Sequence, residues 1–572
     1  MEENYAFKWR IIETWQSPHG ITVFTHSGNL FNWEEMTDPS PSTPLGRYID
    51  QVCEWGFNTM VVLGNPEYKP EAMRNFATYL KNKGIGMFIR REWCEIVVDY
   101  VWPVFKAHGP PLPAGKLCPY NNEVRAFWKK RIERDYELIP DLAGHRFSCG
   151  EFEYTYGAPW LGESPQSKSR NGRERTLEAI RYIAGLLKSR GKTLFWETCQ
   201  DDPWGQRHEA YYYNNFTGEI PDNTYIFFKR NYWDFHSRWP LHPLFDTITV
   251  DAKEQSPYHT CFQQAGEYRG SHDFPWCMVN EWSDTFREMV KTGQQGIWLM
   301  AVPQPDVWDH PLNLVNWYAF SRLMRDPQAD PESIKLNWAE VMFSKASAPV
   351  VVEVLNKVTE AARGMFEFDG LWSACHSQFS NLEYLDSRMC GPYRQHRRMS
   401  GMMGLALPLD MYEPKKAAEI MSDPKTRMVF SQVPITAELK AEAMAQKEGA
   451  IQFMEEAIAL WKELEGKIDA GKFQQILSGL KGNRNDTIIF SCGFDLYMDW
   501  KLGVLTEEKI DTALNTCRDL QGIIVPAPLD ENPEQVFSTV EPASLKTFAE
   551  QLRKDLREPW VEKYWRESGY TA

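Results

Sequence analysis

Four carboxylates stand where short apolar segments of the sequence end. Glu151 and Glu153 close one such segment, Asp234 follows a second, and Glu267 closes a third. Residues two apart on a strand project to the same side, which pairs Glu151 with Glu153. Glycoside hydrolysis needs paired carboxylates, because one protonates the leaving oxygen while another activates water or attacks the sugar. An ion pair explains any single acid equally well, but three strand ends together favour a catalytic site.

The stretch FFKRNYWDFHSRWPLHPLF, residues 227–245, surrounds Asp234 with cations and aromatic rings. Flat rings suit the apolar faces of sugars, although large aromatics that fill a core explain many of them. His236 and His242 are six residues apart, which is weak evidence for a metal site; hydrogen-bonding or structural histidines are the better interpretation. No metal is predicted. The predicted substrate-binding residues are Lys229, Arg230, Trp233, Arg238 and His242 from this stretch, with Glu151, Trp196 and Glu197 from neighbouring strand ends.

Residues 1–325 alternate apolar strand patterns with amphipathic helical patterns, for example TMVV before EAMRNFATYLKN. About eight strands in about 300 residues predict an α/β fold of the (β/α)8 TIM barrel type. The long irregular segments 102–120, 200–223 and 303–313 all follow strands, whereas the links from helix to strand are short. Loops after strands gather at one face of a barrel, so the carboxylates are expected there.

From residue 326 onwards the sequence shows helical spacing with capping residues, as in DPESIKLNWAEVMFS and PASLKTFAEQLRKDLREP. We therefore predict a catalytic barrel at 1–325 and a mainly α-helical C-terminal domain at 326–572.

Composition excludes several classes of protein. The net charge of −15 argues against nucleic-acid binding. No apolar run approaches the roughly 18 residues of a membrane span, so no membrane association is expected. The N-terminus lacks the apolar region of a secretory signal, and the 11 cysteines contain no C-x-x-C pair. A cytoplasmic protein without a cofactor is predicted, with an oligosaccharide as its partner; a homodimer stays open.

The segment 225–345 resembles the α-glucuronidases of glycoside hydrolase family 67. The pattern D-F-x-x-R-x-P-x-H-P-L-F begins at Asp234, and F-Q-x-x-x-E-Y begins at Phe262. The resemblance implies an inverting hydrolase that removes glucuronic or 4-O-methylglucuronic acid from xylan fragments. It implies Glu153 as the general acid and Asp234 with Glu267 as the pair that activates water. Lys229 would bind the uronate carboxylate.

Three departures from the family pattern bear on the substrate. Where the family has an N-terminal β domain, this sequence begins almost directly at the first strand. A family lysine falls at Cys149 and a family arginine falls at Glu197, which exchanges two cations for a thiol and an acid. Two alternatives stay open: the same mechanism on a different sugar, and a non-catalytic carbohydrate-binding protein on a hydrolase scaffold. Glu151 also remains a rival to Glu153 as the acid.

Overall fold

The structure is a computed structural model, and it describes part of the chain. The described residues are 5–13, 31–93, 118–148, 172–197, 218–230, 241, 245, 258–263, 274–300, 311–368, 371–372, 382, 435–521 and 542–560.

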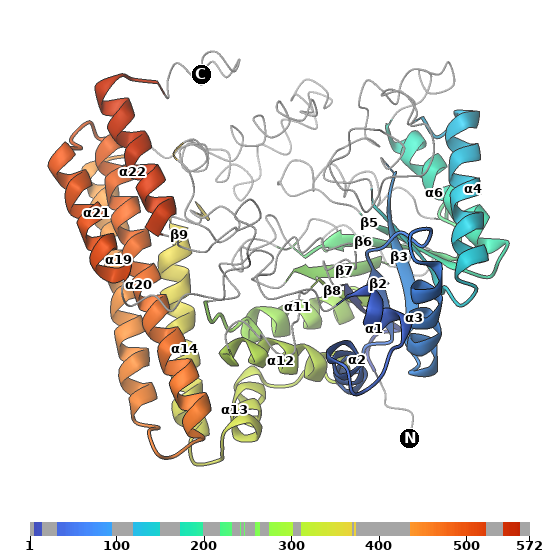
Figure 1. Cartoon of the computed structure of the whole chain (residues 1–572), viewed down its shortest axis with the longest axis horizontal. Helices are drawn as coiled ribbons and strands as arrows, with labels where there is room; N and C mark the ends of the chain where they lie inside the picture. Colours follow the sequence, from blue (N-terminus) through green and yellow to red (C-terminus); the bar gives the residue numbers. More distant parts are fainter. Residues whose placement is uncertain are drawn as a thin grey trace.

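Eight parallel strands form one curled sheet, and β1 pairs with both β2 and β8, so the sheet closes on itself (Figure 1). The strands are β1 Trp9–Glu13, β2 Thr59–Val62, β3 Gly86–Glu92, β4 Gly144–Ser148, β5 Thr193–Glu197, β6 Thr224–Lys229, β7 Tyr258–Gln263 and β8 Gly296–Met300. Parallel neighbours require crossover connections, which the intervening helices provide. The predicted α/β class with a parallel sheet is confirmed.

The helices between residues 31 and 325 pack around the outside of the sheet. They are α1 Trp33–Thr37, α2 Pro44–Trp55, α3 Pro70–Asn82, α4 Asn122–Leu138, α6 Gly172–Lys188, α11 Val279–Lys291, the 3-10 turn η4 Pro311–Asn313, and α12 Leu314–Arg325. Their ends follow local sequence chemistry. In α2 the Thr43 side chain accepts a hydrogen bond from the Gly46 N–H, and Pro44 occupies the first turn. Gly56 ends the helix at φ 93°, a left-handed conformation that favours glycine.

The interior of the barrel is filled by an aromatic layer. Alternate residues of the strands point inward, because the side-chain period of a strand is two. The ring planes of Phe88 and Phe195 stack with centroids 4.1 Å apart. A Cβ at Gly144 would come within 2.4 Å of the Phe88 ring, so only glycine leaves room for this stack. The buried cluster comprises Ile11, Val61, Phe88, Phe195, Tyr225, Phe227 and Trp298.

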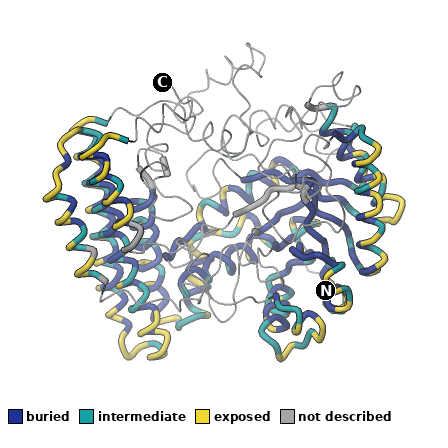
Figure 2. Tube along the Cα trace, turned by 45° about the horizontal axis from the view of Figure 1, so that its top comes forward, coloured by how far each residue is buried: buried dark blue, intermediate teal, exposed yellow. Residues whose placement is uncertain are grey.

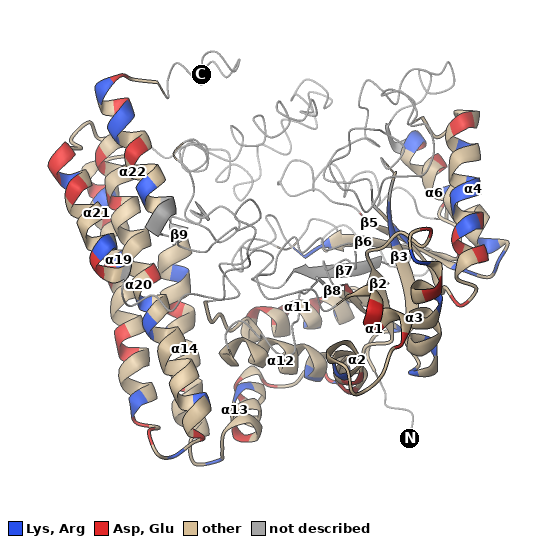
Figure 3. Ribbon diagram, viewed as in Figure 1, with Lys and Arg blue, Asp and Glu red and all other residues tan. Residues whose placement is uncertain are grey.

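The described part of the chain beyond α12 is almost entirely helical. Its elements are α13 Pro331–Met342, α14 Ala348–Phe366, the short strands β9 Glu367–Phe368 and β10 Leu371–Trp372, α19 Ala437–Lys462, α20 Ala470–Lys501, α21 Glu507–Gln521 and α22 Pro542–Arg557. Long helices of this group lie side by side, with buried inner faces (Figures 1 and 2). Charges of both signs mark their outer faces (Figure 3). None of the described helices is long and apolar enough to cross a bilayer.

Candidate functional site: charged residues inside the barrel

A layer of charged side chains lies inside the barrel, beyond the aromatic layer toward the carboxyl ends of the strands. The five residues are Glu13 of β1, Arg90 of β3, Arg146 of β4, Glu197 of β5 and Lys229 of β6. Each is at most 8% exposed. Charged side chains are costly to bury unless they are paired. Five of them inside one barrel therefore indicate that this part of the barrel has a function.

Glu13 holds the two arginines of this charged layer together. Arg90 and Arg146 face each other in register across β3 and β4, where like charges repel. The Glu13 carboxylate lies between them, with Oε1 3.1 Å from Arg90 Nη1 and Oε2 3.9 Å from Arg146 Nε. Arg146 also lies over the Trp298 ring, 4.9 Å from its centroid. The charged layer therefore rests directly on the aromatic layer.

Glu197 forms an ion pair with Arg146. The acid that stands where the family resemblance places an arginine is therefore neutralised by a cation from the adjacent strand. Lys229 lies on the inward face of β6, two residues beyond Phe227 of the aromatic layer, and is 3% exposed. Among the described residues, this layer contains three cations and two carboxylates.

Two predicted substrate-binding residues lie on the outer side of the barrel, Trp196 on β5 and Arg230 directly after the end of β6. Trp196 is fully buried, and its ring stacks parallel to that of Phe147 with centroids 6.3 Å apart, next to Trp93. Arg230 donates a 2.8 Å hydrogen bond from Nε to Oγ1 of Thr285 on α11. Both residues pack between the barrel and its helices, which does not fit the predicted contacts with a sugar.

The other predicted site residues fall outside the described part of the structure. These are Glu151, Glu153, Trp233, Asp234, Arg238, His242 and Glu267. Of the residues predicted from sequence, the structure therefore places Lys229 and Glu197 in the charged layer. The same layer also contains Glu13, Arg90 and Arg146, which were not predicted. For Glu13 the signal was an acid two residues after Ile11 in the strand WRIIE, because the two side chains share one face of the strand.

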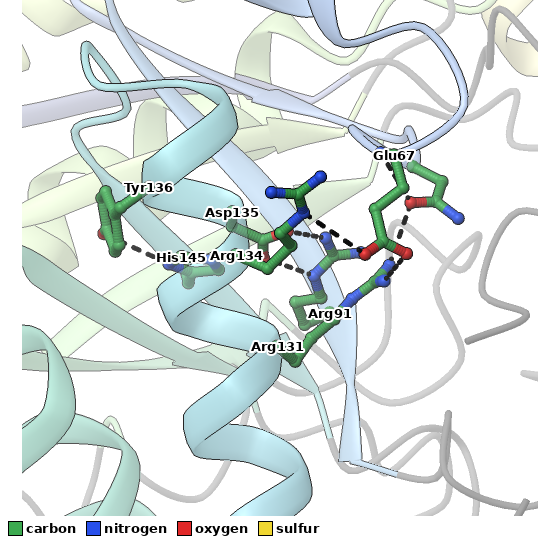
Figure 4. Close-up of polar contacts among 8 residues, drawn as sticks. Glu67, Arg91, Arg131, Arg134, Asp135, Tyr136 and His145 are labelled. Atoms are coloured by element: carbon green, nitrogen blue, oxygen red, sulfur yellow. Dashed lines mark hydrogen bonds and ion pairs between the residues drawn. The ribbon is translucent and has the colours of Figure 1, made fainter. Parts of the chain in front are cut away.

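A second buried polar cluster lies outside the barrel, between β3, β4 and α4 (Figure 4). Arg91 makes two hydrogen bonds to the Asp135 carboxylate, of 3.1 Å and 2.7 Å. His145 lies on the other side of this carboxylate, with Nε2 2.9 Å from Oδ2, and the Tyr136 hydroxyl lies 3.3 Å from Nδ1. This cluster has no exposed surface at Arg91, Asp135 or His145. It therefore stabilises the fold and does not contact substrate.

Burial and charge act in opposite directions on the pKa values of this cluster. Burial alone would raise the pKa of the Asp135 carboxyl, but the charge of Arg91 and the hydrogen bond from His145 outweigh it and hold that pKa well below its usual range. Burial lowers the pKa of His145, and the nearby arginines Arg91 and Arg131 add to this, against the raising effect of Asp135. His145 is therefore neutral in the folded protein at neutral pH, donating from Nε2 and accepting from Tyr136.

We expect acidification to destabilise the protein through His145. Its pKa is lower in the folded than in the unfolded chain, where it is about 6.5, so the unfolded chain binds the proton more readily. The contribution is thus present at neutral pH and declines as pH falls below about 6.5. The check is the shift of the urea midpoint between pH 7.5 and pH 5.0, which should be smaller in His145→Gln than in the wild type. Equal shifts in the two proteins would contradict the assignment.

The fold and the charged layer are those of the parallel α/β barrel enzymes. These enzymes bind small polar substrates through polar groups at the carboxyl ends of their strands. The glycosyl hydrolase family 67 middle domain matches residues 1–311, more than half of the chain. The chain belongs to glycoside hydrolase family 67.

Named relatives are distant. The alpha-glucuronidase A of Emericella nidulans is 21% identical over 425 residues, which cover 63% of this chain and 46% of that protein. The probable alpha-glucuronidase A of Neosartorya fischeri is 22% identical over 252 residues, covering 39% and 28%. The chain thus spans less than half the length of these relatives. Among solved structures, a GH138 enzyme targeting pectin rhamnogalacturonan II matches 98% of this chain and 68% of its own, at 11% identity and a TM-score of 0.53, which shows a shared fold.

Proposed function

We propose that this protein is an inverting glycoside hydrolase that removes a terminal α-linked, glucuronic-type uronic acid from an oligosaccharide. Glu153 acts as the general acid, and Asp234 with Glu267 activates the attacking water. Inversion requires acid and base carboxyls about 6.5–9.5 Å apart, so that water fits between base and sugar. Membership of family 67 supports the reaction type, and the names of the relatives support the sugar.

The inward position of Lys229 is the main structural observation in favour of a uronic acid as the substrate. A buried ammonium near the carboxyl end of β6 is suited to bind a carboxylate on the sugar, since a hydrogen bond between charged groups is about twice as strong as a neutral one. The ion pair between Glu197 and Arg146 supports the same assignment. Because Arg146 balances the charge of Glu197, this acid does not turn the interior of the barrel negative.

A second candidate keeps the reaction and changes the sugar. It is favoured by Glu197, which accepts hydrogen bonds and stands where the family pattern has a cation. A carboxylate at this position can accept hydrogen bonds from sugar hydroxyls, so a different sugar is the alternative substrate. A panel of α-linked glycosides that includes glucuronides and other sugars distinguishes the two candidates.

The proposal includes a catalytic (β/α)8 barrel at 1–325 and a helical domain at 326–572. We also propose that the protein is cytoplasmic and forms a homodimer. Light scattering on the purified chain tests the homodimer directly, because a monomer and a dimer of 66.6 kDa subunits differ twofold in mass.

The test of the proposed function is turnover of an aldouronic oligosaccharide, in which 4-O-methylglucuronic acid caps a xylan fragment by an α-linkage. Proton NMR of the early reaction should show the released uronic acid first as its β-anomer, which then mutarotates. Early accumulation of the α-anomer would contradict inversion. Release of neutral sugars alone, or no hydrolysis of any uronide, would contradict the proposed function.

Lys229→Met is expected to lower kcat/KM on the aldouronic oligosaccharide by about 10- to 100-fold, since a hydrogen bond to a charged group contributes about 1.5–3 kcal/mol. Hydrolysis of the matching neutral glucoside, if present, should not fall. Lys8→Met is the control: Lys8 lies just before β1, and its Nζ donates a 2.7 Å hydrogen bond to the Tyr225 hydroxyl. This variant should retain wild-type kcat/KM. Equal losses on uronide and glucoside would remove Lys229 from carboxylate recognition.

A further inference from the structure

The carboxyl end of β6 is tied to α11 on the outer side of the barrel. The Arg230 guanidinium is buried there, with Nε bonded to Thr285 Oγ1 at 2.8 Å and Nη2 3.5 Å from the Glu281 carbonyl oxygen. Burial lowers the pKa of Arg230 to about 10, while Glu281 and Asp284 raise it, so the side chain stays charged at neutral pH. A buried cation of this kind is fixed in direction by its hydrogen bonds.

Glu281 continues this connection to the helical half of the molecule. Its carbonyl oxygen accepts from Arg230 and also from Thr285, whose hydroxyl lies 2.7 Å away. Its carboxylate forms an ion pair with Arg363 of α14, and Arg363 also pairs with Glu360 at 2.5 Å. Burial would lower the pKa of Arg363, but Glu281 and Glu360 outweigh this and raise it. The ion pair of Glu281 with Arg363 is largely buried, at 13% and 18% side-chain exposure.

Further contacts fix α14 against the segment that leads into α11. The Cys277 N–H donates a 3.1 Å hydrogen bond to the Thr359 hydroxyl of α14. The rings of Trp276 and Phe366 stack with an interplanar angle of 11°. The amino-terminal turn of α11 is therefore held between β6 and α14.

We propose that α14 positions the end of β6 through Arg363, Glu281 and Arg230, and that these three are positioning residues for Lys229 in the proposed reaction. Arg230 directly follows Lys229, the last residue of β6, so the backbone that carries one side chain continues into the other. Holding Arg230 outward therefore sets the direction in which Lys229 points inward. The kinetic part of this inference rests on the proposed function; the structural part does not.

Hydrogen–deuterium exchange of the full chain tests the structural part without any substrate. In Arg363→Met, amides of residues 226–230 should exchange about tenfold faster than in the wild type. The matched control is Lys357→Met, on the same helix, which removes a 2.7 Å ion pair to Glu456 of α19 and not to the barrel. It should leave exchange in β6 unchanged. Unchanged exchange in Arg363→Met, or equal acceleration in Lys357→Met, would overturn the proposal.

Kinetics on the aldouronic oligosaccharide test the link to Lys229. Arg363→Met should raise KM about three- to tenfold with a smaller fall in kcat, Arg363→Lys should recover part of the loss, and Lys357→Met should behave as wild type. A fall in kcat without a change in KM would contradict positioning of Lys229. Glu281→Gln, which keeps the backbone carbonyl that binds Arg230, is the second variant if Arg363→Met does not fold. A wild type without turnover would refute the proposed function, and exchange in β6 would still decide whether α14 holds this strand.

Discussion

Asp234→Asn and Glu267→Gln are each expected to lower kcat on the aldouronic oligosaccharide by about 10²- to 10⁴-fold, the contribution of a positioned acid or base. If the two carboxylates activate one water molecule, either amide leaves the water less nucleophilic while the substrate is still bound. Initial rates and isothermal titration with the same oligosaccharide measure the two effects separately. Affinity should change little, because these acids act on water and not on a group that the ground state already binds.

Glu153→Gln and Glu151→Gln form a matched pair for the general acid. Loss of the acid should slow the natural oligosaccharide far more than an activated aryl uronide, because a good leaving group needs no proton. We expect this pattern for Glu153→Gln and near wild-type rates for Glu151→Gln. The reverse pattern would assign the acid to Glu151. Wild-type rates in all four amide variants would refute the proposed mechanism.

Asp135→Asn is expected to destabilise the protein by about 3–5 kcal/mol, since it leaves Arg91 buried without its counter-charge. The measurement is the midpoint and slope of unfolding in urea at pH 7.5. Glu137→Gln is the control on the same helix. Glu137 forms an ion pair with Arg134, and the two side chains are 64% and 47% exposed. An exposed pair of this kind contributes about 0.5 kcal/mol or less to stability.

A double-mutant cycle separates the pair from its surroundings. Asp135→Leu with Arg91→Met replaces both charges by apolar groups and should recover much of the stability that either single change loses. Additive losses would show that Arg91 and Asp135 do not act as a pair. Equal losses in Asp135→Asn and Glu137→Gln would show that burial does not set the strength of these ion pairs.

The regular elements were largely predictable, because their signals are local. The strand patterns, the capping residues and the helix at 542–557 follow from periods of two and of 3.6 residues. The helix α20 was not predicted individually, although it lies in the part of the sequence predicted to be mainly helical. Its 32 residues bury polar side chains such as Asn483, Asn485 and Thr487 among apolar ones, so no single apolar face marks it. Such a pattern becomes interpretable only when neighbouring helices cover several sides.

Side-chain partners were much less predictable than elements. Lys229 and Arg230 are adjacent cations in the sequence, yet one points into the barrel and the other is bonded to α11. Glu197 stood in the sequence as an acid of unknown surroundings, and its partner Arg146 comes from another strand, 51 positions away. Trp196 had the residue type for stacking on a sugar, but its face of β5 is covered by other rings.

The sequence by itself determined the parallel α/β class, the family resemblance and the types of residue at the strand ends, because these depend on local spacing and on motifs. The tertiary structure decided which side of each strand faces the barrel interior and which charges meet there. Strand periodicity separates two faces without saying which is inside. Closure of β1 onto β8 makes one face interior, and the register between strands brings Glu13, Arg90, Arg146 and Glu197 into contact.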